Sequence, residues 1–265
     1  MIKYIFTSLQ IQYLRICIEF DIFTKIIKKM KFTIIRLTKS IFIKLRLHYI
    51  FGPLEGFFLQ LTQLSKMSRW ANKNRNIPGN DFFSKWDYEK RYLLYNNIIE
   101  SEKLNEEINY LEFGVASGAS FKWWMTKNTN TESRFHGFDT FTGLPEDFGP
   151  YKKGHFNSGE IPKIIDHRGK FYQGLFQQTL PDFLKNFDNT KKKVILMDAD
   201  LYTATLYTLT MLAPYLKKGD IILFDEFSVP THEFKAYSDF VNSYYIELEP
   251  IAVINNYYFI AFKVK

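Results

Sequence analysis

Short apolar runs alternate along the chain from residue 109 onward, with polar turns between them. The runs 110–114, 135–138, 171–173, 194–197 and 221–224 have the length of buried strands, and the longer runs 119–126, 180–187, 202–216 and 232–244 suit helices. Strands that alternate with helices indicate a largely parallel sheet with helices on both faces. The pattern therefore predicts an α/β domain.

The last twenty residues have a different pattern. Residues 246–254 and 257–264 are two β-rich runs that meet at Asn255 and Asn256. Because asparagine tolerates positive φ, a tight turn fits between the two runs. We therefore predict that an antiparallel hairpin closes the sheet.

Residues 1–80 are expected to be a basic, mostly helical extension of the domain in residues 81–265. Ile34, Leu37 and Ile41 have helical spacing, although residues 43–49 also alternate as a strand would. Gly52-Pro53 and the polar run 71–81 are predicted to be connections, and residues 82–104 a helix that precedes the first strand. Charges interrupt each apolar run of the extension well before it reaches the length of a membrane span.

Charge and cysteine content narrow the class of partner and the compartment. The formal charge is +7, and residues 1–50 carry ten Lys and Arg against two acidic residues, which is 10 − 2 = +8 and leaves 7 − 8 = −1 for the rest. A near-neutral domain disfavours nucleic-acid binding. Cys17 has no second cysteine to pair with, so we expect a cytoplasmic location. The basic extension could pack on the domain or a second subunit, or make peripheral contact with an anionic membrane; translation from Met30 would shorten it.

The stretch 110–120, YLEFGVASGAS, is predicted to contain a strand, a turn of small residues and the start of a helix. Glycines at 114 and 118 let a ligand approach the backbone, and the amides at a helix start can donate to it. Asp139 ends the next strand, 139 − 114 = 25 residues after Gly114, where the acidic residue of a nucleotide site holds a ribose diol. Together these features favour a nucleotide-type cofactor site over a turn that serves packing alone.

Four further motifs, GFDTFTGLP, GLFQQTLP, DADLYTAT and FDEF, follow this stretch. With them, residues 81–265 resemble class I S-adenosylmethionine-dependent methyltransferases, and specifically the macrocin O-methyltransferase family, which methylates sugar hydroxyls in macrolide biosynthesis. The resemblance implies a Rossmann-like class I methyltransferase fold with a mostly parallel seven-stranded sheet. It also implies methyl transfer from S-adenosylmethionine to a hydroxyl of a sugar or another polyhydroxylated metabolite.

The resemblance assigns cofactor roles to particular residues. The turn would wrap the methionine end of the cofactor, Asp139 would accept from the ribose hydroxyls, and the end of the third strand would border the adenine. A preceding glutamate would position the amino group. The residues concerned are Glu112, Gly114, Ala116, Ser117, Gly118, Asp139, Gln173 and Gly174.

Carboxylates also follow the next two strands, at Asp198 and at Asp225 with Glu226. By resemblance to metal-dependent members of the family, these three residues would hold Mg²⁺, which prefers carboxylate oxygen. The family usually carries two aspartates at the second position, so Glu226 departs from its pattern. Asp200 is expected to cap the helix that starts near residue 202.

Asp198 and His232 are the predicted catalytic residues, with His232 as the base that takes the proton of the acceptor hydroxyl. His155 is the competing base, since it lies in the long polar segment 142–162, where a lid over the substrate is expected. His136 is expected to be structural.

Two other functions are open at this point. A nicotinamide dehydrogenase would share the glycine turn, but Glu112 before the turn and the terminal hairpin favour a methyltransferase. An inactive methyltransferase-fold subunit that binds a membrane or a partner is the second, and retention of Asp198 and Asp225 argues against it. A homo-oligomer is also compatible with the sequence.

Overall fold

The computed structural model describes residues 2–265, and it describes side chains from Phe20 onward except that of Ile22. The chain divides into two compact units, with the boundary between Phe58 and Leu59. This boundary lies upstream of the one predicted at residues 80 and 81.

The first unit is helical. It contains α1 (Ile2–Lys44), the short α2 (His48–Phe51), the 3-10 turn η1 (Gly52–Leu54) and the start of α3 (Glu55–Lys73). Residues 43–49 form no strand: α1 ends at Lys44, residues 45–47 are a turn, and α2 starts at His48. No helix in the described part of the chain is both long enough and apolar enough to cross a bilayer.

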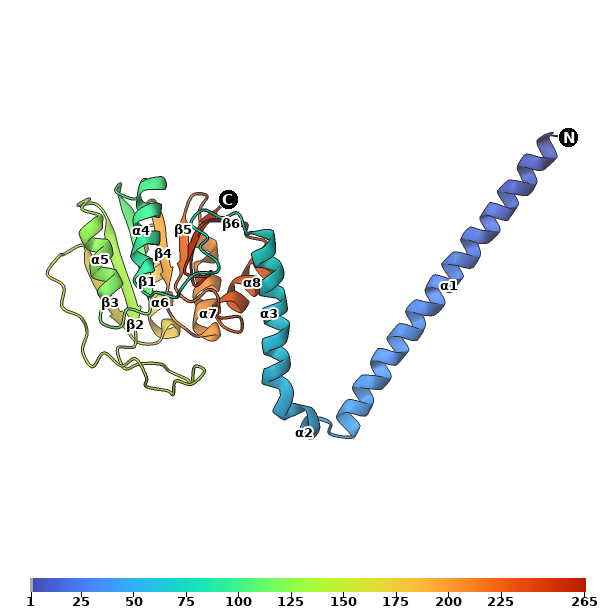
Figure 1. Cartoon of the computed structure of the whole chain (residues 1–265), viewed down its shortest axis with the longest axis horizontal. Coiled ribbons are helices and arrows are strands. Elements are labelled where there is room, and N and C mark those ends of the chain that lie inside the picture. Colours follow the sequence, from blue (N-terminus) through green and yellow to red (C-terminus); the bar gives the residue numbers. More distant parts are fainter. Residues whose placement is uncertain (1) are drawn as a thin grey trace. The chain divides into compact units, whose positions relative to one another are not determined.

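The second unit is built on a seven-stranded sheet of order β3-β2-β1-β4-β5-β7-β6 (Figure 1). The strands are β1 (Ile108–Phe113), β2 (Arg134–Asp139), β3 (Gly169–Gln173), β4 (Lys192–Met197), β5 (Ile221–Phe224), β6 (Leu248–Ile254) and β7 (Phe259–Val264). Strands β1 to β5 are parallel, and β7 runs antiparallel to both β5 and β6. Asn255 and Asn256 have φ of 57° and 58° at the hairpin turn, so the predicted hairpin is confirmed.

Side chains alternate between the two faces of the sheet, and each face is covered by helices. In β1, Tyr110 joins the core under α4 (Lys90–Ser101) and α5 (Ala119–Lys127), whereas Leu111 joins the core under α6 (Phe176–Lys185), α7 (Tyr202–Leu212) and α8 (Glu233–Tyr244). Both residues are fully buried, and each such side chain contributes about 1.5 to 3 kcal/mol. The predicted three-layer α/β/α arrangement is confirmed.

Two helix boundaries differ from the prediction. Helix α4 starts at Lys90 rather than near residue 82, because the preceding backbone bonds to the hairpin turn: the amides of Ser84 and Asp87 donate to the side chains of Asn256 and Asn255, each at 3.0 Å. Helix α6 starts at Phe176, four residues early, where the Gln178 side chain accepts from the Leu175 amide at 3.1 Å. Hydrogen bonds to side chains therefore set where these helices begin. The side chains are distant in the sequence for α4 and local for α6.

Strands β1 and β4 are neighbours in the sheet, but β1 is followed by β2 on one side and β4 is followed by β5 on the other. The strand order therefore reverses between β1 and β4. Ligands of open α/β sheets bind at such a point, outside the carboxyl ends of the strands. The cofactor and metal residues predicted from the sequence lie mainly at the ends of β1, β2, β4 and β5, at this edge of the sheet.

Candidate functional site

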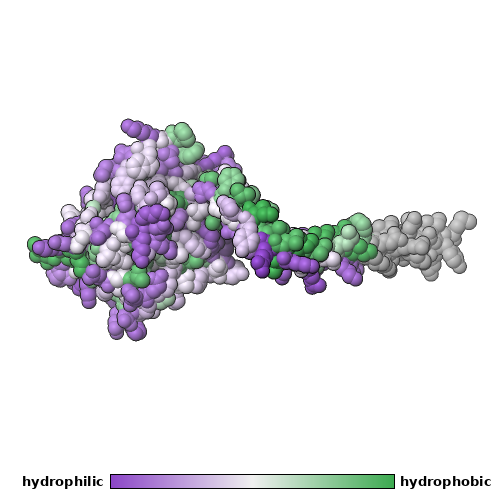
Figure 2. Space-filling view, turned by 90° about the horizontal axis from the view of Figure 1, so that it is seen from below, coloured by the Kyte–Doolittle hydropathy of each residue, from purple (hydrophilic) through white to green (hydrophobic). Residues whose placement is uncertain are grey.

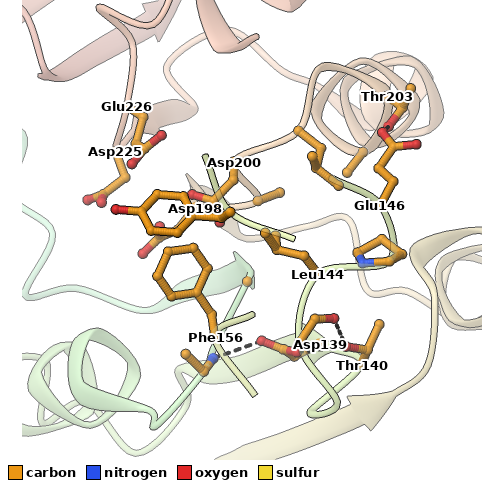
Figure 3. A pocket seen from close by; sticks show the side chains of 18 of the residues that line it. Asp139, Thr140, Leu144, Glu146, Phe156, Asp198, Asp200, Thr203, Asp225 and Glu226 are labelled. Atoms are coloured by element: carbon orange, nitrogen blue, oxygen red, sulfur yellow. Dashed lines mark hydrogen bonds between the residues drawn. The ribbon is translucent and has the colours of Figure 1, made fainter. Parts of the chain in front are cut away.

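A pocket of about 670 Å³ opens at the carboxyl ends of these strands (Figure 3). Its volume falls in the range of small-molecule sites. Among the predicted site residues, those that line it are Gly114, Ala116, Asp139, Asp198, Asp225 and Glu226. Those that do not are Glu112, Ser117, Gly118, Gln173, Gly174 and His232.

Gly114 allows the ends of β1 and β4 to meet. Its φ is +95°, and a Cβ at this position would overlap the backbone carbonyl oxygen of Asp198. The Asp198 amide donates to the carbonyl of Phe113 at 2.9 Å, which fixes this approach. Only glycine combines this φ with so close a neighbour.

Asp139 binds the turn that follows Gly114. One carboxylate oxygen accepts from the amides of Val115 and Ala116 at 2.7 and 2.8 Å, and the other accepts from the amide of Phe141 at 2.7 Å. Two of the turn amides that were expected to face a ligand therefore bond to Asp139 instead. The carboxylate still lines the pocket, and its oxygens have further lone pairs for a ribose diol.

The remaining predicted cofactor residues lie around this turn. Glu112 is buried and accepts from the Tyr110 hydroxyl at 2.5 Å, and burial raises its pKa well above the usual range. Gly118 has φ +77° and stands at the start of α5. Gln173 faces a second hollow, and Gly174 donates its amide to the carbonyl of Asp139 at 2.9 Å. Leu175, Phe176 and Gln177, just beyond them, line the main pocket.

Four carboxylates gather on the side of the pocket formed by β4 and β5: Asp198, Asp200, Asp225 and Glu226 (Figure 3). The sequence did not assign a partner to them, and the structure supplies Arg91 from α4. Its guanidinium bonds to Asp225 at 2.6 Å and lies 3.6 Å from Asp198. It also donates to Ser120 at 3.1 Å and stacks 3.7 Å from the ring of Tyr88.

This side of the pocket carries more negative charge than Arg91 balances. Burial raises the pKa of Asp225 well above its usual range, with repulsion from Asp198 adding to it. Burial likewise raises the pKa of Asp198 and of Glu226. In the described part of the chain, Asp225 Oδ1 and Glu226 Oε2 have no hydrogen-bond partner. The arrangement therefore favours a ligand that brings hydroxyl donors or positive charge.

The predicted Mg²⁺ ligands do not converge on a common point. Among the described residues, no three carboxylate, histidine or cysteine side chains are placed to hold a metal ion. Asp225 is bonded to Arg91, and Glu226 accepts from the Tyr258 hydroxyl. The residues as arranged do not fit the ion, because a guanidinium already occupies the space between the two aspartates.

Asp200 does not cap α7, contrary to the prediction. The N-cap is Leu201, and no side chain bonds to the helix start from that position. Asp200 has φ 58° and lines the pocket instead. Burial, with repulsion from Asp198, Glu226 and Asp139, raises its pKa to about 8. A carboxyl group with this pKa can exchange a proton near neutral pH.

The histidines lie away from the pocket wall. The Tyr202 amide donates to Nδ1 of His232 at 3.3 Å, the ring packs on Phe148, and burial lowers its pKa. His155 stacks on Tyr151 in the loop after β2. His136 is packed on Phe183, and burial lowers its pKa to about 4, as suits a structural residue. The structure thus does not bring His232 to the carboxylates.

The long loop after β2 forms one wall of the pocket. Gly143, Leu144, Glu146, Tyr151 and Phe156 from this loop line it. The Thr203 hydroxyl donates to Glu146 at 2.7 Å and ties the loop to α7 (Figure 3). Trp86, Tyr88 and Tyr258 add aromatic surface near the carboxylates. This wall is where the sequence placed a lid.

The sheet order, the terminal hairpin and the pocket position are those of a class I methyltransferase fold. Residues 111–227 match the model of a family described as a methyltransferase domain. The chain is similar to the crystal structure of CalS11, a calicheamicin methyltransferase, with 22% identity and a TM-score of 0.51 over 67% of this chain and 78% of that one. An apo structure of CalS11, described as a TDP-rhamnose 3′-O-methyltransferase, gives 23% identity and a TM-score of 0.48 over 64% and 77%.

A third similar structure is the O-methyltransferase NovP, with 19% identity and a TM-score of 0.49 over 66% of this chain and 78% of that one. No protein of curated function matches the sequence. The matched region, residues 111–227, contains Asp139, Asp198 and Asp225 together with the glycine turn.

Proposed function

We propose that this chain is an S-adenosylmethionine-dependent O-methyltransferase that acts on a hydroxyl of a sugar or another polyhydroxylated metabolite, as in the macrocin O-methyltransferase family. One observation carries the proposal. A single pocket of a methyltransferase fold joins the Asp139-bound turn on one side to four carboxylates on the other. The first side suits a nucleoside, and the second suits an acceptor with several hydroxyls.

The residues present fit the cofactor. Asp139 stands at the end of β2, where a ribose diol is bound in this fold, and Leu175 and Phe176 offer apolar surface beside it for a base. When bound, S-adenosylmethionine would supply a methyl group on a positively charged sulfur, and the carbon–sulfur bond would break to release a neutral thioether as the hydroxyl oxygen bonds to the methyl carbon. Gly114 keeps the backbone at this point free of a side chain.

The acceptor is bound by the carboxylate side of the pocket. Asp200 and Glu226, which line this side and are partly exposed, accept hydrogen bonds from its hydroxyls. Asp200 lines the same wall and takes the proton of the reacting hydroxyl as its oxygen bonds to the methyl carbon. Arg91 keeps Asp225 and Asp198 in place, so that the acceptor oxygen is held in line with the methyl group.

The predicted use of Mg²⁺ requires Asp225 to give up its 2.6 Å bond to Arg91. From the observed arrangement we expect methyl transfer to survive treatment with a chelator. Electron paramagnetic resonance with Mn²⁺ as the probe measures binding separately from activity. Loss of activity on chelation, restored by Mg²⁺, together with tight Mn²⁺ binding that Asp225→Asn removes, would reinstate the metal site at Asp198, Asp225 and Glu226.

The test of the proposed function is transfer of a labelled methyl group from S-adenosylmethionine to a panel of acceptors. The panel contains nucleotide sugars, other glycosides, catechols and carboxylic acids. Because CalS11 is described as a TDP-rhamnose 3′-O-methyltransferase, nucleotide sugars are the first class to try. Transfer to glycosides supports the proposal, transfer confined to catechols or carboxylates replaces the acceptor class, and binding of a nicotinamide cofactor in place of S-adenosylmethionine rejects the enzyme class.

A further inference from the structure

Helix α1 has an exposed apolar stripe. Its members recur three and four residues apart and therefore lie on one side of the helix. All are exposed, from 42% for Ile41 to 60% for Phe23. The stripe consists of Phe23, Ile26, Ile27, Met30, Ile34, Leu37 and Ile41, whereas Phe32, Ile35, Phe42 and Ile43 lie outside it. Figure 2 shows hydrophobic side chains running on toward the grey end of the chain.

The other side of the helix is basic. Between Asp21 and Glu55 the sequence contains eight Lys and Arg residues and no Asp or Glu. Lys25, Lys28, Arg36 and Lys39 lie on the side opposite the stripe by helical spacing, and Lys29 and Lys31 flank it. Lys25 bonds to Asp21 at 2.6 Å, and both side chains are well exposed. The segment therefore combines an uncovered apolar stripe with charge of one sign.

The positive charge of α1 indicates which kind of partner binds the stripe. The spacing of Phe23, Ile27 and Met30, continued along the helix, would also suit a coiled coil with a second copy. Two copies, however, would offer no acidic residue between Asp21 and Glu55 to pair with Lys29 and Lys31, which flank the stripe. An anionic lipid bilayer accepts the apolar side chains at its surface and attracts the lysines at its headgroups, with the long lysine side chains reaching up to them.

We propose that α1 binds flat on the surface of an anionic lipid bilayer, with the apolar stripe buried and the basic side at the headgroups. This inference is independent of the proposed methyl transfer, since it uses residues 23–41 and no residue of the pocket.

Co-sedimentation of the full chain with vesicles tests the proposal. We expect at least about 10-fold stronger binding to phosphatidylcholine vesicles that contain phosphatidylglycerol than to phosphatidylcholine alone, and a marked loss of binding in about 0.5 M salt. The triple variant Ile27→Asn, Ile34→Asn, Ile41→Asn should lose binding through the stripe. The triple variant Lys28→Glu, Arg36→Glu, Lys39→Glu should lose it through the charge.

The matched control is Ser40→Asn, on the same helix but outside the stripe, which should bind as the original chain does. Circular dichroism and S-adenosylmethionine titration check that each variant is folded. Equal binding to neutral and anionic vesicles, or no binding by the folded full chain, would overturn the proposal. The full chain could instead fail to bind vesicles and form a dimer in sedimentation velocity. If the triple variant Ile27→Asn, Ile34→Asn, Ile41→Asn dissociates that dimer, the stripe is an interface between two copies.

Discussion

The two sides of the pocket satisfy their carboxylates in opposite ways. At the end of β2, Asp139 accepts from three backbone amides within 2.8 Å. At the ends of β4 and β5, Asp198 and Asp225 share Arg91, and the pKa values of Asp198, Asp200 and Asp225 are all raised. Asp139 makes its hydrogen bonds to the backbone without a ligand. On the second side, a ligand that brings positive charge or hydrogen-bond donors would relieve the repulsion among the carboxylates.

This difference explains how one fold provides both rigidity and reactivity. A carboxylate that accepts from three backbone amides fixes the turn against which the cofactor is proposed to bind. Carboxylates that repel each other in a buried site have raised pKa values, about 8 for Asp200, and can accept a proton. The predictions below test whether the two sides are independent.

The largest effect is expected from Gly114→Ala, which would force the ends of β1 and β4 apart. Gly219 is the matched control, because it has the same φ of +95° but nothing within 4 Å of a Cβ. Gly219→Ala should cost about 1 to 2 kcal/mol for the left-handed backbone alone. Gly114→Ala should cost at least about 4 kcal/mol, because the overlap with Asp198 adds to that strain. Urea denaturation of both variants measures the difference; similar losses would show that the close approach relaxes easily.

Arg91→Met should destabilise the fold by about 3 to 5 kcal/mol, since it leaves Asp225 buried without its partner. The neighbouring Lys90→Met is the control, because Lys90 pairs with Asp81 where both side chains are more than 20% exposed. We expect it to cost about 1 kcal/mol or less. Thermal denaturation compares the two. If both variants lose equally little, Arg91 does not hold the carboxylates.

Much of this site follows from the sequence because the strand ends do. Apolar runs that stop at Asp139, Asp198 and Asp225 place these carboxylates at one edge of a parallel sheet, whatever the details of packing. Arg91 is different, since it lies 134 residues from Asp225 along the chain. A signal for it was present: Arg91 shares the spacing of the buried residues Leu94, Tyr95, Ile98 and Ile99 in α4.

Asp200 and His232 lie elsewhere than the sequence suggested, for local reasons. An aspartate two residues before a helix is typical of a cap, but φ of 58° at Asp200 turns its side chain into the pocket. His232 stands just past β5 in the sequence, yet the Tyr202 amide and the ring of Phe148 hold it at the start of α8. The sign of φ and the packing of a side chain at such points depend on tertiary contacts, which a single sequence does not show.

Asp200→Asn should lower turnover by at least about 100-fold, because the amide cannot accept the acceptor proton. With a pKa of about 8, Asp200 is protonated below that pH. Activity of the original chain, as kcat/KM, should therefore rise with pH up to about 8 and level off above it. The control is Asp182→Asn, an exposed aspartate on α6 paired with Lys185. A flat profile, or an unchanged turnover in Asp200→Asn, would assign the proton to another group.

Calorimetric titration with S-adenosylmethionine tests most directly whether the β2 side of the pocket binds the cofactor and the carboxylate side does not. The account predicts one binding site per folded chain. Asp139→Ala should weaken binding by about 1.5 to 3 kcal/mol, roughly 10- to 150-fold, the range for hydrogen bonds to a charged group. Asp200→Asn should leave the affinity within about 3-fold while it abolishes transfer. Absence of binding in the folded chain, or normal affinity in a folded Asp139→Ala variant, would contradict the claim that the β2 side of the pocket holds the cofactor.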